Sequence, residues 1–186
     1  MHKSTTKELV DVNLFPHFMN DALKFVRPVA LLDAAHLRSE WLRTLYIASV
    51  LAGNNDVFPI GIMIATGNED RATWTKMLKL LKEACPILEK QGSDEVDDGL
   101  PREHPFLFVS DQDKGLLPAL KEVFLMNMDI SCARHIQENV SKRFGKPCAK
   151  LVMAIAQTYS ARKASNRLDA IQQLKASAAA YYSVPK

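Results

Sequence analysis

Short, continuous apolar runs separated by polar turns occupy the first part of the chain, and this pattern predicts buried strands. The runs VALLD (29–33), TLYIASVLAG (44–53) and VFPIGIMIAT (57–66) each have the length and composition of a strand. The segment GNND (53–56) between the last two is a turn signal. The second and third runs are therefore expected to form an antiparallel hairpin beside the first.

The pattern then changes to helical spacing and alternates with two further strand-like runs. Trp74, Met77, Leu78 and Leu81 recur at three- and four-residue steps, which predicts one buried face of a helix. Further strands are expected at FLFVSD (106–111) and MDISC (128–132), and further helices at 115–124, at 133–144 and throughout the segment after Pro147. The order βββαβαβα with additional C-terminal helices predicts an α/β fold with a mixed sheet and crossover helices.

The same pattern predicts how the chain is organised. Residues 1–27 are expected to form a helical or irregular lead-in, residues 28–150 the α/β core, and residues 151–186 a basic helical segment. Within the core, residues 89–104 hold six acids, two glycines and a proline, so a solvated loop is expected there.

Composition places the chain among soluble globular proteins. Of its 186 residues, 47% are hydrophobic and 24% are charged. No apolar run is long enough to span a bilayer, and the polar N-terminus does not have the pattern of a secretory signal. Three scattered cysteines are too few for a disulfide framework, so a reducing compartment is expected.

The net charge of +3 conceals a strong asymmetry along the chain. Residues 134–186 contain ten Lys and Arg against two acids, a net charge of +8, whereas residues 1–133 have a net charge of −5. This division indicates an anionic partner for the C-terminal segment. Solvation of exposed helix faces explains the same residues without any partner.

Two of the predicted strands end in an aspartate, Asp33 and Asp111. If the strands are parallel neighbours, both carboxylates emerge at the same edge of the sheet. Paired carboxylates repel each other unless a cation lies between them, and hard oxygen ligands suit Mg²⁺ or Mn²⁺. Alternatively, each aspartate only ends its strand or caps the helix that follows.

Three sequence segments in a fixed order resemble those of Mutator-like element (MULE) transposases. These segments are DAAHL (33–37) with the strand pair and Trp-containing helix that follow it, FVSDQDKGLLPALKEVF (108–124) and CARHIQENVSKRF (132–144). The resemblance extends from about Arg27 to about Tyr182. It implies a ribonuclease-H-like domain that cleaves and joins DNA with two bound metal ions.

By this resemblance, Asp33 and Asp111 are the first two acids of a DDE triad and the ligands of Mg²⁺ or Mn²⁺. After Glu138 the chain contains no glutamate, so Asp169 is the candidate for the third catalytic acid. Cys132 and His135 match the family's C-x-x-H segment and are assigned a structural role. Because two ligands fall short of the four that a structural zinc needs, zinc is not expected here.

The resemblance also implies a partner and a location. Transposon-end DNA is the expected partner, the nucleus the expected compartment and a homo-oligomer an expected assembly, with no membrane association. The candidate DNA-binding residues are Lys142, Arg143, Arg162, Lys163 and Arg167. Two alternatives to an active transposase stay open, because the third acid departs from the family pattern: an inactive, domesticated DNA-binding module and a protein-interaction module.

Overall fold

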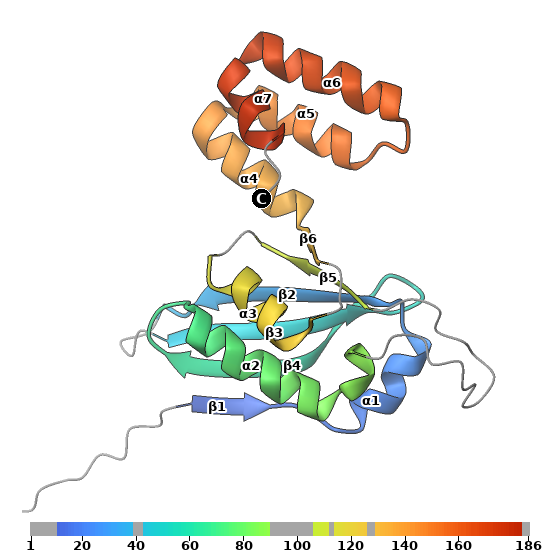
Figure 1. Cartoon of the computed structure of the whole chain (residues 1–186), viewed down its shortest axis with the longest axis vertical. Helices are drawn as coiled ribbons and strands as arrows, with labels where there is room; N and C mark the ends of the chain where they lie inside the picture. The colour runs from blue at the N-terminus through green and yellow to red at the C-terminus, as the bar shows by residue number, and fades with distance from the viewer. Residues whose placement is uncertain (1–10, 39–42, 90–105, 112–113, 126–128, 184–186) are drawn as a thin grey trace, which may run out of the picture. The chain divides into compact units, whose positions relative to one another are not determined.

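A computed structural model of the chain consists of one mixed sheet with helices against it and a separate group of helices (Figure 1). It describes residues 11–38, 43–89, 106–111, 114–125 and 129–183. The chain divides into two compact units, unit 1 (Met1–Ile130) and unit 2 (Ser131–Lys186). The boundary expected after residue 150 falls within a helix of unit 2.

The six strands have the order β1-β4-β3-β2-β5-β6 in the sheet. Their bounds are β1 Asp11–Leu14, β2 Val29–His36, β3 Arg43–Leu51, β4 Val57–Thr66, β5 Leu107–Ser110 and β6 Asp129–Ser131. Strand β3 pairs antiparallel with both β2 and β4, which confirms the predicted hairpin and its place beside the first run. Strand β5 pairs parallel with β2 on the opposite side, so a crossover connection returns the chain across the sheet.

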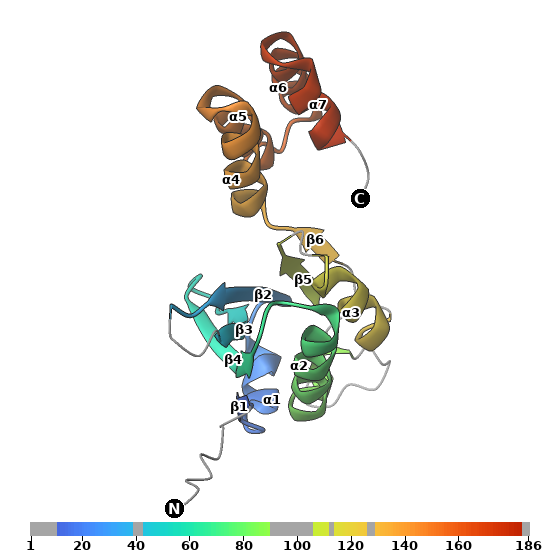
Figure 2. The same cartoon turned by 90° about the vertical axis from the view of Figure 1, so that its left-hand side faces the viewer.

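Two helices of unit 1 cover the same face of the sheet (Figures 1 and 2). They are α2 (Arg71–Ala84) and α3 (Leu116–Val123), and they pack against each other. The predicted buried face of α2 is confirmed, because Trp74, Met77, Leu78 and Leu81 are all fully buried. Shorter helical segments are α1 Met19–Ala22, η1 Leu23–Phe25 and η2 Pro86–Leu88.

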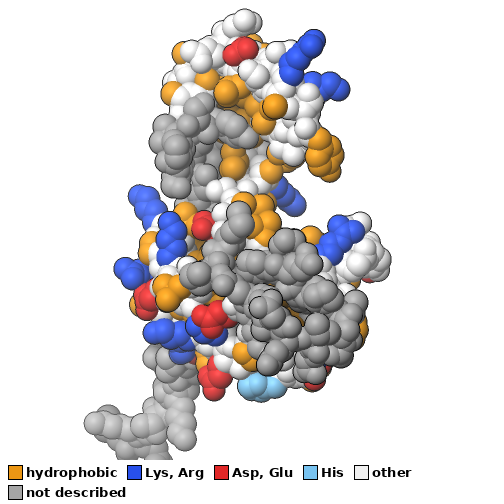
Figure 3. All heavy atoms as spheres, turned by 45° about the vertical axis from the view of Figure 1, so that its right-hand side comes forward, with side chains coloured by type: hydrophobic (Ala, Val, Ile, Leu, Met, Phe, Trp, Pro, Cys, Tyr) orange, Lys and Arg blue, Asp and Glu red, His pale blue; other side chains and the backbone are white. Residues whose placement is uncertain are grey.

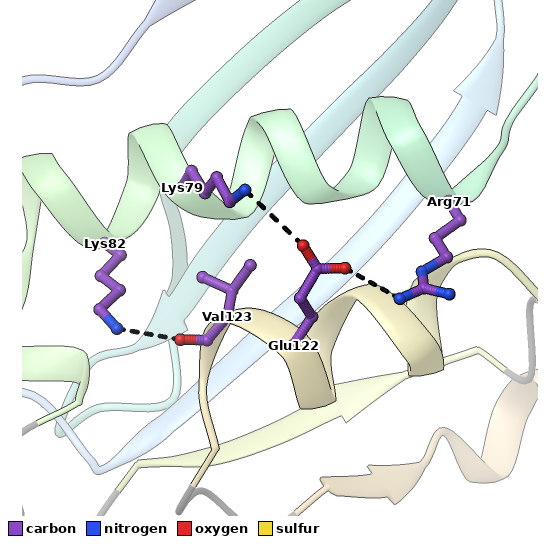
Figure 4. Close-up of polar contacts among 5 residues, drawn as sticks. All are labelled: Arg71, Lys79, Lys82, Glu122 and Val123. Carbon is purple, nitrogen blue, oxygen red and sulfur yellow. Dashed lines mark hydrogen bonds and ion pairs between the residues drawn. The ribbon is translucent and has the colours of Figure 1, made fainter.

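Polar contacts on the solvent side reinforce the packing of α3 on α2 (Figure 4). The Glu122 carboxylate of α3 accepts a hydrogen bond from Arg71 Nη2 at 2.9 Å and lies 3.6 Å from Lys79 Nζ. Lys82 Nζ donates to the carbonyl of Val123 at 3.0 Å, next to the last turn of α3. These contacts therefore join the solvent-facing sides of α2 and α3, the two helices that cover the sheet.

In its described residues, unit 2 consists of helices, the connections between them and the last residue of β6, and it has a core of its own. Its helices are α4 Ala133–Phe144, α5 Lys146–Ala156, α6 Ala161–Leu174 and α7 Ala176–Ser183. Each packs on the next in sequence. The buried residues at its centre are Val140, Cys148, Ala149, Val152, Ile171, Ala178 and Ala179. Among the described helices of both units, none is long and apolar enough to cross a bilayer.

One expectation from the sequence was wrong in part. The lead-in contains strand β1 in addition to helical turns, and β1 pairs antiparallel with β4 from Asp11 to Leu14. The C-terminal segment consists of several helices, as expected, and the hydroxyl of Ser160 caps α6 by accepting the backbone N–H of Lys163. The acidic loop at 89–104 lies outside the described residues except for Glu89.

Candidate functional site

The two aspartates predicted as a pair follow adjacent positions on neighbouring parallel strands. The register of β2 with β5 ends at the pair Leu32 and Ser110, and the next residues along the two strands are Asp33 and Asp111. Neighbouring strands lie about 4.8 Å apart. The backbone therefore brings the two aspartates to one edge of the β2–β5 ladder, as the chain pattern predicted.

The surroundings of this pair differ on the two faces of the sheet. Leu32 and Ser110 are buried on the face that α2 and α3 cover, whereas Asp33 is exposed and Asp111 is half-buried. Side chains alternate along a strand, so Asp33 lies on the face opposite to Leu32. Its Oδ1 accepts the backbone N–H of Ala34 at 3.0 Å. Asp33 is therefore accessible to a ligand that approaches from solvent.

Next to the pair, on the covered face of the sheet, the hydroxyl of Ser110 is a buried polar group that the chain pattern does not predict. Ser110 is 1% exposed, and its Oγ has no hydrogen-bond partner among the described residues. A buried hydroxyl without a partner costs about 1–3 kcal/mol relative to a satisfied one. This cost lies in the residue that immediately precedes Asp111.

A hydrogen-bonded chain fixes the histidine that follows the first aspartate. The hydroxyl of Thr44 donates to the carbonyl of Gly67 at 2.8 Å, so it accepts from Nδ1 of His36 at 3.1 Å. His36 is three positions beyond Asp33 on the same strand and therefore lies on the other face of the sheet. This contact holds the His36 ring on the face of the sheet that α2 covers, away from the face that carries Asp33.

A second polar group lies next to β2 and was also missed by sequence reasoning. Tyr46 on β3 pairs in register with Ala34, is fully buried and meets the ring of Trp74 edge to face at 4.8 Å between centroids. Burial, followed by the negative charge of Glu69, raises the pKa of Tyr46 to about 12. Its hydroxyl has no partner in hydrogen-bond geometry among the described residues. The Thr73 side chain is nevertheless near enough to lower the pKa of Tyr46 and so to oppose part of the increase.

The carboxylates at the start of α2 have structural partners. Asp70 Oδ1 accepts the backbone N–H of Thr73 at 2.8 Å and caps the helix, and these hydrogen bonds from Thr73 lower the pKa of Asp70. Glu69 Oε1 accepts Nε1–H of Trp74 at 2.8 Å. These two acids therefore hold the helix and its tryptophan in place next to the hairpin.

The other predicted site residues belong to unit 2. Asp169 is exposed on α6, so the candidate third acid and the Asp33–Asp111 pair lie in different units. Cys132 precedes α4 and His135 is in its first turn, and both are partly exposed. Cys148 lies in the apolar core of unit 2. In the described parts of the chain, no three His, Cys, Asp or Glu residues come together as a metal-binding group.

The predicted basic residues lie on two helices that both pack against α5. Lys142 and Arg143 are in the last turn of α4, and Arg162, Lys163 and Arg167 are on α6. The boundary between the units coincides with the division of charge, since unit 2 contains all ten of the C-terminal Lys and Arg and only two acids. On the face that Figure 3 shows, acidic side chains gather mainly on the unit that holds the sheet.

Comparison with models of protein families gives a match over nearly the whole chain. The family model described as "Transposase, Mutator family" matches residues 10–185, nearly the whole chain. No curated protein matches the chain. The matched range includes both units, the Asp33–Asp111 pair and the basic helices.

Proposed function

Because the chain belongs to the Mutator family of transposases, we propose that Asp33 and Asp111 serve DNA cleavage and strand transfer by holding Mg²⁺ or Mn²⁺. The observation that carries this proposal is their position one residue beyond the Leu32–Ser110 pair of the parallel β2–β5 ladder. Two carboxylates at such positions form a cluster of hard oxygen donors. This is the donor chemistry that Mg²⁺ and Mn²⁺ prefer.

The arrangement of the sheet supports the further proposal that unit 1 has a ribonuclease-H-like fold. Three antiparallel strands, β2, β3 and β4, are followed by strands added on the free side of β2, with α2 and α3 as the intervening helices. In this order β2 is one of the two central strands, and its parallel neighbour β5 ends beside it. That placement puts Asp33 on a central strand and Asp111 directly after the strand next to it.

Asp33 and Asp111 supply two of the carboxylates that a site for divalent ions needs. Asp33 is exposed and contributes a carboxylate on the face opposite to α2, and Asp111 contributes a second one at the end of β5. When bound, ions of this kind polarise a phosphodiester and lower the pKa of a coordinated water. We propose Asp169 of α6 as the third acid, and an aspartate there must approach more closely than the longer glutamate would.

The experiment compares Asp33→Asn and Asp111→Asn with Asp21→Asn, a matched change at an exposed residue of α1. Two readouts are taken on the full chain: Mn²⁺-dependent nicking of transposon-end DNA, and the midpoint of thermal unfolding with and without Mn²⁺ in the absence of DNA. At an ion concentration tenfold above Kd, linkage stabilises the wild type by about 1 to 2 kcal/mol, which is a shift of a few degrees.

We expect Asp33→Asn and Asp111→Asn to abolish both the nicking and the Mn²⁺-dependent shift, and Asp21→Asn to retain both. A wild-type protein that shows neither response to Mn²⁺ would contradict a metal site at this pair. A retained shift in Asp33→Asn and Asp111→Asn would instead place the ion elsewhere in the chain.

A catalytically inactive DNA-binding module is the second candidate, and the charge of unit 2 favours it. A net charge of +8 on a unit of 56 residues attracts a polyanion whether or not unit 1 cleaves DNA. This candidate predicts DNA binding that weakens steeply with salt and is indifferent to chelators and to Asp33→Asn. Binding of that kind without any Mn²⁺-dependent nicking would favour it over the active enzyme.

A further inference from the structure

Unit 2 contains a cavity of about 440 Å³ where α5 ends and α6 begins. Its volume is within the range of small-ligand sites, which is about 300–1,000 Å³. The lining residues come from the end of α5, from the connection and from the first turns of α6, and none of them is acidic: Ala154, Gln157, Thr158, Tyr159, Ser160, Lys163 and Arg167.

The two cations of the cavity lie on one face of α6. Lys163 and Arg167 are four residues apart, which makes them neighbours on a helix surface. The Arg167 guanidinium donates to the backbone carbonyl of Ala154, and this hydrogen bond anchors it against the end of α5. A guanidinium has five N–H donors, so the anchored group retains donors for an anion. The cavity therefore has a positive wall with one ordered arginine.

Among the large hydrophobic side chains of the described residues, Tyr159 is the most exposed, with a relative accessibility of 107%. The connection that carries it is held by local hydrogen bonds. The backbone N–H of Thr158 donates to the carbonyl of Ile155 at 3.0 Å, and that of Ser160 donates to the Thr158 hydroxyl at 3.3 Å. An aromatic ring is thus presented to solvent from a fixed connection, beside two cations.

We propose that this cavity binds one nucleotide of an unpaired DNA strand, with its phosphate at Lys163 and Arg167 and its base stacked on Tyr159. An aromatic platform beside cations is the combination by which proteins bind single strands without reading their sequence. A duplex buries its base faces in the stack, so it offers phosphates to the cations but no face to the tyrosine. The proposal rests on DNA being the partner of this chain, and it assigns unpaired strands to this cavity.

The test measures binding of the full chain to a fluorescent oligothymidylate and to a duplex of the same length, both in EDTA. Tyr159→Ala is the main variant, because a fully exposed ring contributes nothing to the core and its loss leaves folding intact. Tyr159→Phe keeps the stacking surface. Lys163→Gln removes one cation of the cavity, and Lys150→Gln makes the same change at an exposed position of α5 outside the lining.

We expect Tyr159→Ala to weaken oligothymidylate binding about tenfold and duplex binding less than twofold, and Tyr159→Phe to behave as the wild type. Lys163→Gln should weaken single-strand binding several times more than Lys150→Gln does. Equal effects of Lys163→Gln and Lys150→Gln, together with an unchanged Tyr159→Ala, would overturn the cavity assignment. If the wild type binds neither DNA, both this assignment and the role of DNA as partner fail. Because EDTA is present, a failure of the metal site leaves the outcome unaffected.

Discussion

Replacement of Tyr46 by phenylalanine tests the electrostatics beside the central strand. The Tyr46 ring packs edge to face on Trp74 with 4.8 Å between centroids, and phenylalanine preserves that contact. The substitution removes only the hydroxyl, which is buried and has no hydrogen-bond partner among the described residues. Removal of a tyrosine hydroxyl with a good hydrogen-bond partner would lower the stability of the protein, whereas removal of this hydroxyl should not.

The expected magnitude follows from two separate terms. At neutral pH, removal of an unsatisfied buried hydroxyl recovers a desolvation penalty of about 1–3 kcal/mol. The small void that the hydroxyl leaves has a cost of its own, which reduces this gain. We therefore expect Tyr46→Phe to raise the free energy of unfolding by about 1 kcal/mol at pH 7. In the alkaline range, a pKa of about 12 in the folded protein against the ordinary tyrosine pKa of 10.0 corresponds to roughly 2 to 3 kcal/mol.

The sign of the alkaline term follows from proton linkage. Above pH 10 the unfolded tyrosine loses its proton while the folded one keeps it, so the unfolded state binds fewer protons and stability falls until the pH passes about 12. Tyr46→Phe should lack this loss. Burial also raises the pKa of Cys85 from 9.0 to about 11, but that contribution is common to both proteins and cancels in their difference.

The assay is urea unfolding followed by tryptophan fluorescence, at pH 7 and at several values between 10 and 12. A Tyr46→Phe protein that loses about 1 kcal/mol at pH 7 and keeps the alkaline decline of the wild type would refute an unsatisfied Tyr46 hydroxyl. In that case Thr73→Val, alone and combined with Tyr46→Phe, shows whether the Thr73 hydroxyl bonds to the tyrosine, because the two changes would then not be additive.

Two further predictions concern the packing within each unit. Arg71 lowers the pKa of Glu122 by a hydrogen bond, so Glu122→Gln should reduce stability at pH 7. The difference in stability from the wild type should vanish in acid and shrink in salt. Glu83→Gln is the control, because the Glu83 side chain is exposed, and an equal loss of stability in it would contradict this role of Glu122. Gly145, between α4 and α5, has φ 93° and ψ 164°, and an added Cβ would meet only Pro147 Cδ at 3.7 Å. Gly145→Ala should therefore lower the free energy of unfolding by about 1–3 kcal/mol through backbone strain alone, as measured by circular dichroism. Gly53→Ala should be nearly neutral, and a Gly145→Ala protein as stable as the wild type would contradict the strain.

The fold could be predicted where burial determines the pattern along the chain. The hairpin, the parallel strand and the buried face of α2 all follow from apolar spacing, because each of these elements has one buried face. Strand β1 could not be predicted in this way, since it has only four residues, Val12 and Leu14 are largely exposed, and its place depends on backbone pairing with β4. The break between α5 and α6 depends on the hydroxyls of Thr158 and Ser160 in a stretch without glycine or proline.

The candidate site divides in the same way. The juxtaposition of Asp33 and Asp111 could be predicted, because each directly follows an apolar run and the two runs form parallel neighbouring strands. The expectation that Asp33 ends its strand was wrong, since β2 continues to His36 through its pairing with β3. The contact of His36 with Thr44 could not be predicted, since it depends on the register of β2 with β3 and joins residues eight positions apart. The residue that precedes α3 is Gly115, which has no side chain with which to cap the helix.

The division of charge between the units separates two physical tasks. Unit 1 has a net charge of −5 and unit 2 one of +8, so a polyanion is repelled by the first and attracted by the second over a distance set by screening. In the proposed function, a divalent cation at Asp33 and Asp111 reverses the local sign where a phosphodiester would react. The proposal therefore predicts that the salt dependence of DNA binding reports on unit 2 and the Mn²⁺ dependence on the aspartate pair, so the two contributions are separable in one intact chain.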